Sequence, residues 1–176
     1  MGVEVQRWAR TCARCQASKI HRHIKAPCAT FPPVQHRFEH IHVDIVGPLP
    51  SSLRSTHLLT VFDRFTRWPE AFPLPETSTL MLTRVLLHGW ITRFGTPSVI
   101  MSDQGSQFVS ELWRHFSMFL GVELHQTTAY HPQANGLIER VHRDLKASLR
   151  TRLKTTGDNW TDQLLWVLFG LRTAFK

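Results

Sequence analysis

The strongest constraint on the fold of this chain is the order in which short strand-like segments and longer helical segments follow each other after residue 35. Three strands come first, and a helix, a strand, a helix, a strand and two helices follow. This order predicts an α/β fold in which a mixed five-stranded sheet is flanked by helices. The expected strands are 41–45, 57–63, 67–74, 98–102 and 122–126, and the expected helices are 78–94, 107–120, 137–153 and 160–173.

Local patterns add detail to three of these segments. In the first strand, alternation places Ile41, Val43 and Ile45 on one face and His42, Asp44 and Val46 on the other. Pro69 and Pro73 predict an edge position for the third strand, because proline cannot donate to a sheet. Residues 127–136 are small and polar and predict a loop, with Asn135 as the N-cap of the next helix.

The charge of the chain narrows the kinds of partner it can have. Lysine and arginine number 21 against 13 acids, a formal net charge of +8. Such an excess favours binding to a polyanion, although it is equally compatible with a role in solubility alone. No apolar segment is long enough to cross a bilayer, and the polar N-terminus does not have the pattern of a signal peptide, so we expect a soluble intracellular protein with no membrane partner.

Three acidic residues stand at places where catalytic groups are common. Asp44 lies within the first strand, Asp103 directly follows the strand 98–102, and Glu139 lies early in the long helix. Carboxylates of this kind can hold two Mg²⁺ or Mn²⁺ ions for phosphoryl transfer. Each acid also has an ordinary structural interpretation. Asp44 could be a solvated strand residue, Asp103 could be a turn or N-cap residue, and Glu139 could form an ion pair with Arg143 one turn along the helix.

Flanking motifs decide between these readings. The chain resembles the integrases of retroviruses and, more closely, of gypsy-like long-terminal-repeat retrotransposons. Between Asp103 and Glu139 lie 35 residues, which is the characteristic second spacing of that family. The segments that carry the resemblance are HIHVDIVGPLP (40–50), LLTVFDRFTRWPEAFP (58–73), FGTP (94–97), SDQGSQF (102–108), TTAYHPQANGLIER (127–140) and GLRTA (170–174).

The resemblance implies a ribonuclease-H-like fold and a metal-binding triad formed by Asp44, Asp103 and Glu139. It implies DNA integration by a polynucleotidyl transferase, which first acts as an endonuclease that trims the 3′ ends of element DNA and then transfers those strands into target DNA. Asp63 matches a family residue outside the triad, and we expect it to be structural. Members of the family work as multimers, so we expect a homo-oligomer that acts in the nucleus and also occurs in cytoplasmic pre-integration particles.

The long helix predicts where DNA lies. An apolar stripe predicts the core-facing side and is formed by Ile138, Val141, Leu145 and Leu149. A second stripe joins Glu139 to three cations, Arg143, Lys146 and Arg150, and it predicts either a phosphate-binding face or a merely solvated one. The resemblance favours DNA contact for Arg143 and Lys146, and for Tyr130 and Gln133 in the loop before the helix.

The segment 1–35 differs from the rest of the chain and ends in prolines that indicate a linker. Cys12 and Cys15 have the two-residue gap of a zinc-binding pair. The family's upstream histidine pair has no counterpart here, so we expect no stable Zn²⁺ site. The expected organisation is therefore a remnant of a zinc-binding domain with its linker in 1–35 and a C-terminally shortened integrase catalytic core in 36–176.

Two other functions stay open at this stage. The first is a catalytically inactive remnant or domesticated module that binds nucleic acid without chemistry. The second is a nuclease of the same fold that cleaves RNA–DNA hybrids. The intact triad argues against the first, and the motifs around Asp103 and residues 130–140 argue against the second.

Overall fold

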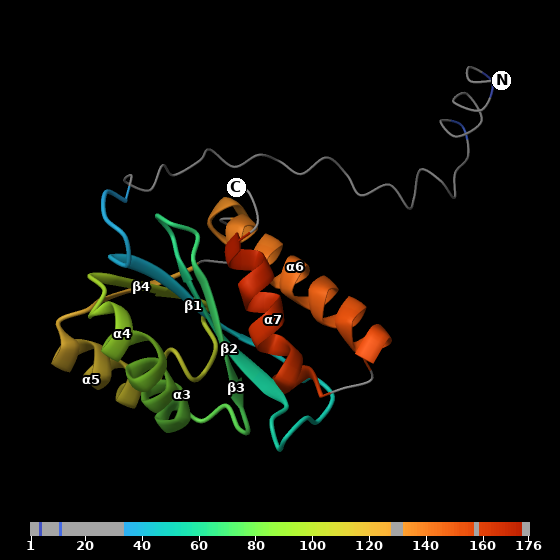
Figure 1. The fold of residues 1–176 in the computed structure, drawn as a ribbon. Coiled ribbons are helices and arrows are strands. Elements are labelled where there is room, and N and C mark those ends of the chain that lie inside the picture. Colours follow the sequence, from blue (N-terminus) through green and yellow to red (C-terminus); the bar gives the residue numbers. More distant parts are fainter. Residues whose placement is uncertain (1–3, 5–10, 12–33, 128–131, 157–158, 174–176) are drawn as a thin grey trace.

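A computed structural model describes residues 4, 11, 34–127, 132–156 and 159–173, and these form a layered α/β domain (Figure 1). Its five-stranded sheet has the order β3-β2-β1-β4-β5. The pairs β3–β2 and β2–β1 are antiparallel, whereas β1–β4 and β4–β5 are parallel, which confirms the predicted mixed sheet. The strands are β1 (His40–Val46), β2 (His57–Asp63), β3 (Pro69–Leu74), β4 (Val99–Ser102) and β5 (Glu123–Gln126).

The helices lie on the two sides of this sheet, with α3, α4 and α5 gathered on one side and α6 and α7 on the other (Figure 1). None of the described helices is long and apolar enough to span a bilayer. The helical elements are α3 (Thr79–Leu86), the π-helical turn η1 (Leu87–Ile91), α4 (Thr92–Phe94), α5 (Glu111–Leu120), α6 (Pro132–Thr156) and α7 (Trp160–Thr173).

Alternation along β1 separates two hydrophobic cores. Ile41 and Val43 belong to the core under α3 and α5, together with Trp90. Val46 belongs to the core under α6 and α7, together with Leu145. The predicted division of β1 into two faces is therefore confirmed, and the face that carries Asp44 is the one that α6 covers.

The predicted edge strand is also confirmed, because β3 ends the sheet and contains both prolines. The predicted first helix is confirmed, and it contains one π-helical turn, η1, between α3 and α4. It ends at Gly95, whose φ of 87° lies in the left-handed region that glycine tolerates. No periodicity of apolar residues distinguishes such a turn from ordinary helix.

Two helix starts were predicted wrongly. Helix α5 begins at Glu111 rather than at 107, because the Ser110 side chain accepts a hydrogen bond from the backbone N–H of Trp113 over 3.3 Å and caps the helix there. Helix α6 begins at Pro132, within the predicted loop, so Asn135 is not an N-cap. Proline suits the first turn of a helix, where its missing N–H has no partner to lose.

Candidate active site

The register of two parallel strands brings two of the predicted acids together. His40 pairs with Val99 and His42 pairs with Met101 between β1 and β4. Asp44 lies two residues after His42 within β1, and Asp103 lies two residues after Met101, directly after the end of β4. Asp44 lies on the face of the sheet that α6 covers, and Asp103 is near enough for its charge to act on the Asp44 carboxyl group.

The carboxyl group of Asp44 is largely withdrawn from water, with 30% of its side chain exposed. Burial raises its pKa from the ordinary value of 3.8 to about 6, and the negative charge of Asp103 acts in the same direction. The Ile45 N–H, which donates to Asp44 Oδ1 over 2.7 Å, and the charge of Lys146 oppose the rise. A cation bound between the two acids would offset their repulsion, and their oxygens are ligands that Mg²⁺ and Mn²⁺ prefer.

Asp103 lies in an exposed turn directly after β4. Its Oδ1 accepts a hydrogen bond from the Gly105 N–H over 2.9 Å, which orients the carboxylate. A Cβ atom at position 105 would lie 3.0 Å from that same oxygen, so glycine preserves the arrangement. The structural reading of Asp103 as a turn residue is thus correct, and it is compatible with a metal-binding role for the other oxygen.

Helix α6 crosses the sheet directly above Asp44. His142 Nδ1 lies 3.5 Å from Asp44 Oδ2, and His142 Nε2 lies 2.9 Å from Thr60 Oγ1. Position 139 is three residues earlier and therefore on the same side of the helix, while the side chain of Glu139 lies outside the described residues. Among the side chains that are described, no three His, Cys, Asp or Glu residues form a metal-binding group.

Sequence reasoning missed His142 and Thr60. Thr60 pairs with Asp44 in the β1–β2 register, and its hydroxyl donates to the Asp44 carbonyl oxygen over 3.0 Å. The spacing of three residues from Glu139 could have indicated His142, because such residues share one side of a helix. Nothing local in the sequence indicates Thr60, whose role depends on strand pairing.

The three predicted cations of the long helix are exposed on α6, as expected. These cations are Arg143, Lys146 and Arg150. Together with His142 and Ala147 they line an open cavity of about 420 Å³. The charge of Lys146 also acts to lower the pKa of Asp44, against the larger effect of burial, so this cation is near enough to act on the acidic centre. This arrangement could hold a polyanion against the acidic centre.

Comparison with known proteins identifies the family. Residues 34–132, more than half of the chain, match the family model of the integrase core domain. The chain belongs to the integrase core domain family. This integrase core is also 32% identical over 139 residues to the Pro-Pol polyprotein of simian foamy virus type 3, which covers 79% of the chain and 12% of that polyprotein. It is 33% identical over 133 residues to the Gag-Pol polyprotein of koala retrovirus, covering 75% of the chain and 8% of that polyprotein.

Solved structures show the same fold at lower sequence identity. A simian T-cell lymphotropic virus intasome structure matches with a TM-score of 0.71 and 19% identity, over 98% of this chain and 61% of that chain. The HTLV-2 integrase catalytic core matches with a TM-score of 0.65 and 16% identity, over 79% of this chain and 89% of that chain. The predicted ribonuclease-H-like fold of this integrase core is therefore confirmed.

The remaining predicted site residues of the integrase core are placed only in part. Tyr130, Cys12 and Cys15 lie outside the described residues. Gln133 lies in the first turn of α6, and its side chain is outside them as well. The predicted DNA contacts of Tyr130 and Gln133 stay predictions, as do the expectation that Cys12 and Cys15 form no stable Zn²⁺ site and the division at residue 35.

Asp63 has the structural role expected of it. One of its carboxyl oxygens accepts a hydrogen bond from the Phe38 N–H over 2.9 Å, and the other accepts from the Thr66 N–H over 2.7 Å. It is fully buried, and these bonds join the β2–β3 hairpin to the segment before β1. Both carboxyl oxygens therefore have structural partners.

Proposed function

We propose that this chain forms the catalytic centre of a DNA integrase, a polynucleotidyl transferase that performs 3′-end processing and strand transfer. In this proposal Asp44, Asp103 and Glu139 bind two Mg²⁺ or Mn²⁺ ions. The observation that carries it is that Asp44 lies near Asp103, which directly follows the neighbouring strand β4, and that α6 contacts Asp44 through His142, one turn after position 139. Family membership supports the reaction, and the related HTLV-2 catalytic core was solved in complex with magnesium.

The residues of this chain would position the reactants. Two bound cations would supply activation of an oxygen nucleophile and stabilisation of charge at phosphorus. The Ile45 and Gly105 N–H groups hold one oxygen of each aspartate and leave the other for a ligand. Arg143 and Lys146 would bind phosphates of the element DNA and fix its ends beside the acids.

The proposed partners are element DNA, target DNA and a second copy of the chain, and the proposed place of action is the nucleus. Helix α7 exposes three large apolar side chains, Leu165, Trp166 and Phe169, on adjacent turns. Clustered exposed apolar side chains of this size mark interaction surfaces. The HTLV-2 core was solved in a dimeric form, which supports self-association.

The test is a strand-transfer assay with Mn²⁺ and a duplex oligonucleotide that carries an element end. The wild-type chain should join the oligonucleotide to a second duplex, and Asp103→Asn and Glu139→Gln should each abolish joining. Glu111→Gln is the matched control, because Glu111 is exposed on α5 on the other side of the sheet. Loss of joining in the control, or joining that survives both active-site changes, would contradict the proposal.

The two other functions give different results in the same experiment. A non-catalytic module would bind the duplex without producing any joined or trimmed strand. A nuclease for RNA–DNA hybrids would cleave a hybrid faster than it trims the DNA end. Comparing the three substrates at one Mn²⁺ concentration therefore separates the functions.

A further inference from the structure

His142 is the one described side chain outside the predicted triad whose ring contacts the Asp44 carboxylate. Its Nδ1 faces Asp44 Oδ2 at 3.5 Å, and its Nε2 faces Thr60 Oγ1 at 2.9 Å. The ring is mostly buried, with 14% of the side chain exposed. Its two nitrogens therefore have fixed and different partners.

The hydrogen bonds of Thr60 determine which ring nitrogen carries a proton. A threonine hydroxyl has one proton, and the Asp44 carbonyl oxygen can only accept it. Thr60 Oγ1 must then accept from His142, so the proton of a neutral ring lies on Nε2. Nδ1 is left with a lone pair that is directed at the Asp44 carboxylate.

The hydrogen bonds of the ring leave no proton between Nδ1 and the Asp44 carboxylate, 3.5 Å apart. A lone pair and an ionised carboxylate that face each other repel. The contact becomes favourable when a cation lies between them.

We propose that His142 Nδ1 is a direct ligand of the divalent cation held by Asp44, so that this metal site contains a nitrogen donor in addition to carboxylates. Two ligands that are each about 2.1 Å from one cation lie about 3.0–3.4 Å apart at angles of 90–110°. The distance of 3.5 Å between Nδ1 and Oδ2 is close to this range. Only a small movement of the ring is needed.

A nitrogen donor changes which metal the site prefers. Imidazole nitrogen binds divalent first-row transition metals, of which Mn²⁺ is the weakest binder, more strongly than it binds Mg²⁺, which prefers oxygen ligands. The site should therefore favour Mn²⁺ over Mg²⁺ more strongly than a site made only of carboxylates. This inference rests on the proposed function, because it requires that a cation binds at Asp44.

The test measures metal binding and needs no catalysis. Mn²⁺ alone is titrated into the full chain, and electron spin echo envelope modulation is recorded to detect nitrogen bound to manganese. Wild-type protein should show ¹⁴N coupling, and labelling its histidines with ¹⁵N should replace this signal by that of ¹⁵N. The second measurement is the Kd for Mn²⁺, which should weaken by roughly tenfold or more in His142→Asn, while the Kd for Mg²⁺ changes less.

His115→Asn is the matched control, because His115 is exposed on α5 and should leave both signals unchanged. Asp44→Asn separates this inference from the proposed function. If Mn²⁺ binding is lost in Asp44→Asn but the wild type shows no ¹⁴N coupling, His142 is not a ligand and the proposed function stands. If Mn²⁺ does not bind the wild type, or binds Asp44→Asn equally well, both proposals are wrong.

Discussion

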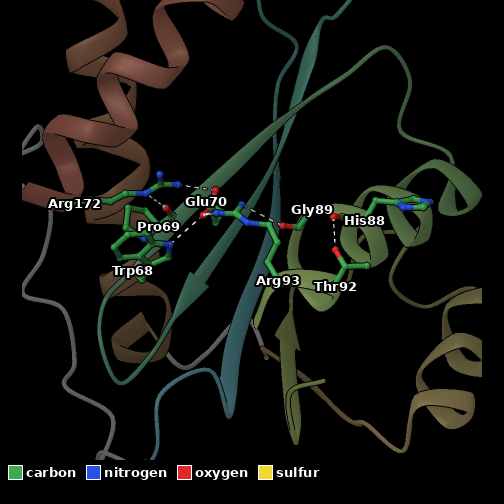
Figure 2. A network of polar contacts seen from close by, with 8 residues as sticks. All are labelled: Trp68, Pro69, Glu70, His88, Gly89, Thr92, Arg93 and Arg172. Carbon is green, nitrogen blue, oxygen red and sulfur yellow. Dashed lines mark hydrogen bonds and ion pairs between the residues drawn. The ribbon is translucent and has the colours of Figure 1, made fainter. Parts of the chain in front are cut away.

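Arg172 Nη2 lies 2.6 Å from Glu70 Oε2 and thereby joins the last turn of α7 to the edge strand β3 (Figure 2). The Glu70 side chain is only 4% exposed, and its other oxygen lies 3.2 Å from Arg93 Nη2 and 3.0 Å from Trp68 Nε1. Arg172 also donates to the Pro69 carbonyl oxygen and stacks over the Trp68 ring. One buried carboxylate thus links helices from both sides of the sheet.

Arg172→Ala should lower the free energy of unfolding by about 3 kcal/mol, because it removes the close partner of a buried charge. Arg93→Ala is the matched comparison and should cost at most about 1 kcal/mol, since its side chain is 48% exposed. Urea denaturation of both variants measures the difference. Equal losses in the free energy of unfolding would show that Arg172 stabilises the buried Glu70 carboxylate no more than Arg93 does.

Asp44→Asn should raise the free energy of unfolding of the metal-free chain by about 2 kcal/mol at pH 7.5. The folded pKa of Asp44, about 6, lies above its ordinary value of 3.8, mainly through burial. The proton therefore stabilises the fold below pH 4, and this stabilisation is lost as the pH rises through 6. Denaturation curves in EDTA should show the advantage of asparagine at pH 7.5 and its disappearance towards pH 4, whereas an advantage that is constant with pH would contradict the assignment.

Replacing the cations of α6 singly by alanine should weaken DNA binding and reduce its dependence on salt. Removing a cation that contacts a phosphate should reduce the magnitude of the slope of log K against log salt by about 1. The three cations to be replaced are Arg143, Lys146 and Arg150. Fluorescence anisotropy of a labelled duplex over a range of NaCl concentrations gives this slope. Arg84→Ala, an exposed change on α3, should leave it unaffected, and an equal effect there would indicate non-specific attraction by net charge.

Two glycine-to-alanine changes in helical segments should have opposite effects on stability. A Cβ atom at Gly89 would lie 2.5 Å from the Phe72 ring, so Gly89→Ala should destabilise by about 1–3 kcal/mol through overpacking. A Cβ atom at Gly170 in α7 meets nothing within 4 Å, so Gly170→Ala should stabilise by up to about 1 kcal/mol. Thermal denaturation of the pair checks both signs, and a stabilising Gly89→Ala would mean that Phe72 moves aside freely.

Trp166→Lys should shift the chain towards the monomer, because it places a charge in the apolar face of α7. Phe119→Lys is the comparison on α5, where Phe119 is 88% exposed and lies on the other side of the sheet. Analytical ultracentrifugation measures the dissociation constant of both variants. If Phe119→Lys alone disrupts association, the interface lies on α5 instead.

Sequence patterns predicted the elements well where side-chain periodicity and local end signals agree. The strand 57–63 and the helix 160–173 have the predicted bounds in the structure. The start of α6 was misplaced because small polar residues at 133–136 resemble a loop, yet Pro132 begins a helix there. The π-helical turn η1 could not be predicted, since its residues keep the apolar spacing of the helix around it.

The candidate site was predictable as far as its acids follow from motif and strand order. The adjacency of Asp44 and Asp103 follows once β1 and β4 are known to be parallel neighbours. The contact of His142 with Asp44 and Thr60 depends on where α6 crosses the sheet, which tertiary packing decides. The spacing along α6 indicates only that His142 shares one side of the helix with position 139.

The placement of Asp44 within β1 and of Asp103 directly after the neighbouring strand β4 has a consequence for how such a site can vary. The two strands lie at the inter-strand spacing of about 4.8 Å, which changes little between β-sheets. Helix α6 has no comparable fixed distance from the strands, because side chains determine how closely it approaches. Substitutions beneath α6 can therefore change the size of the site, whereas the spacing of the two strands under the aspartates stays the same.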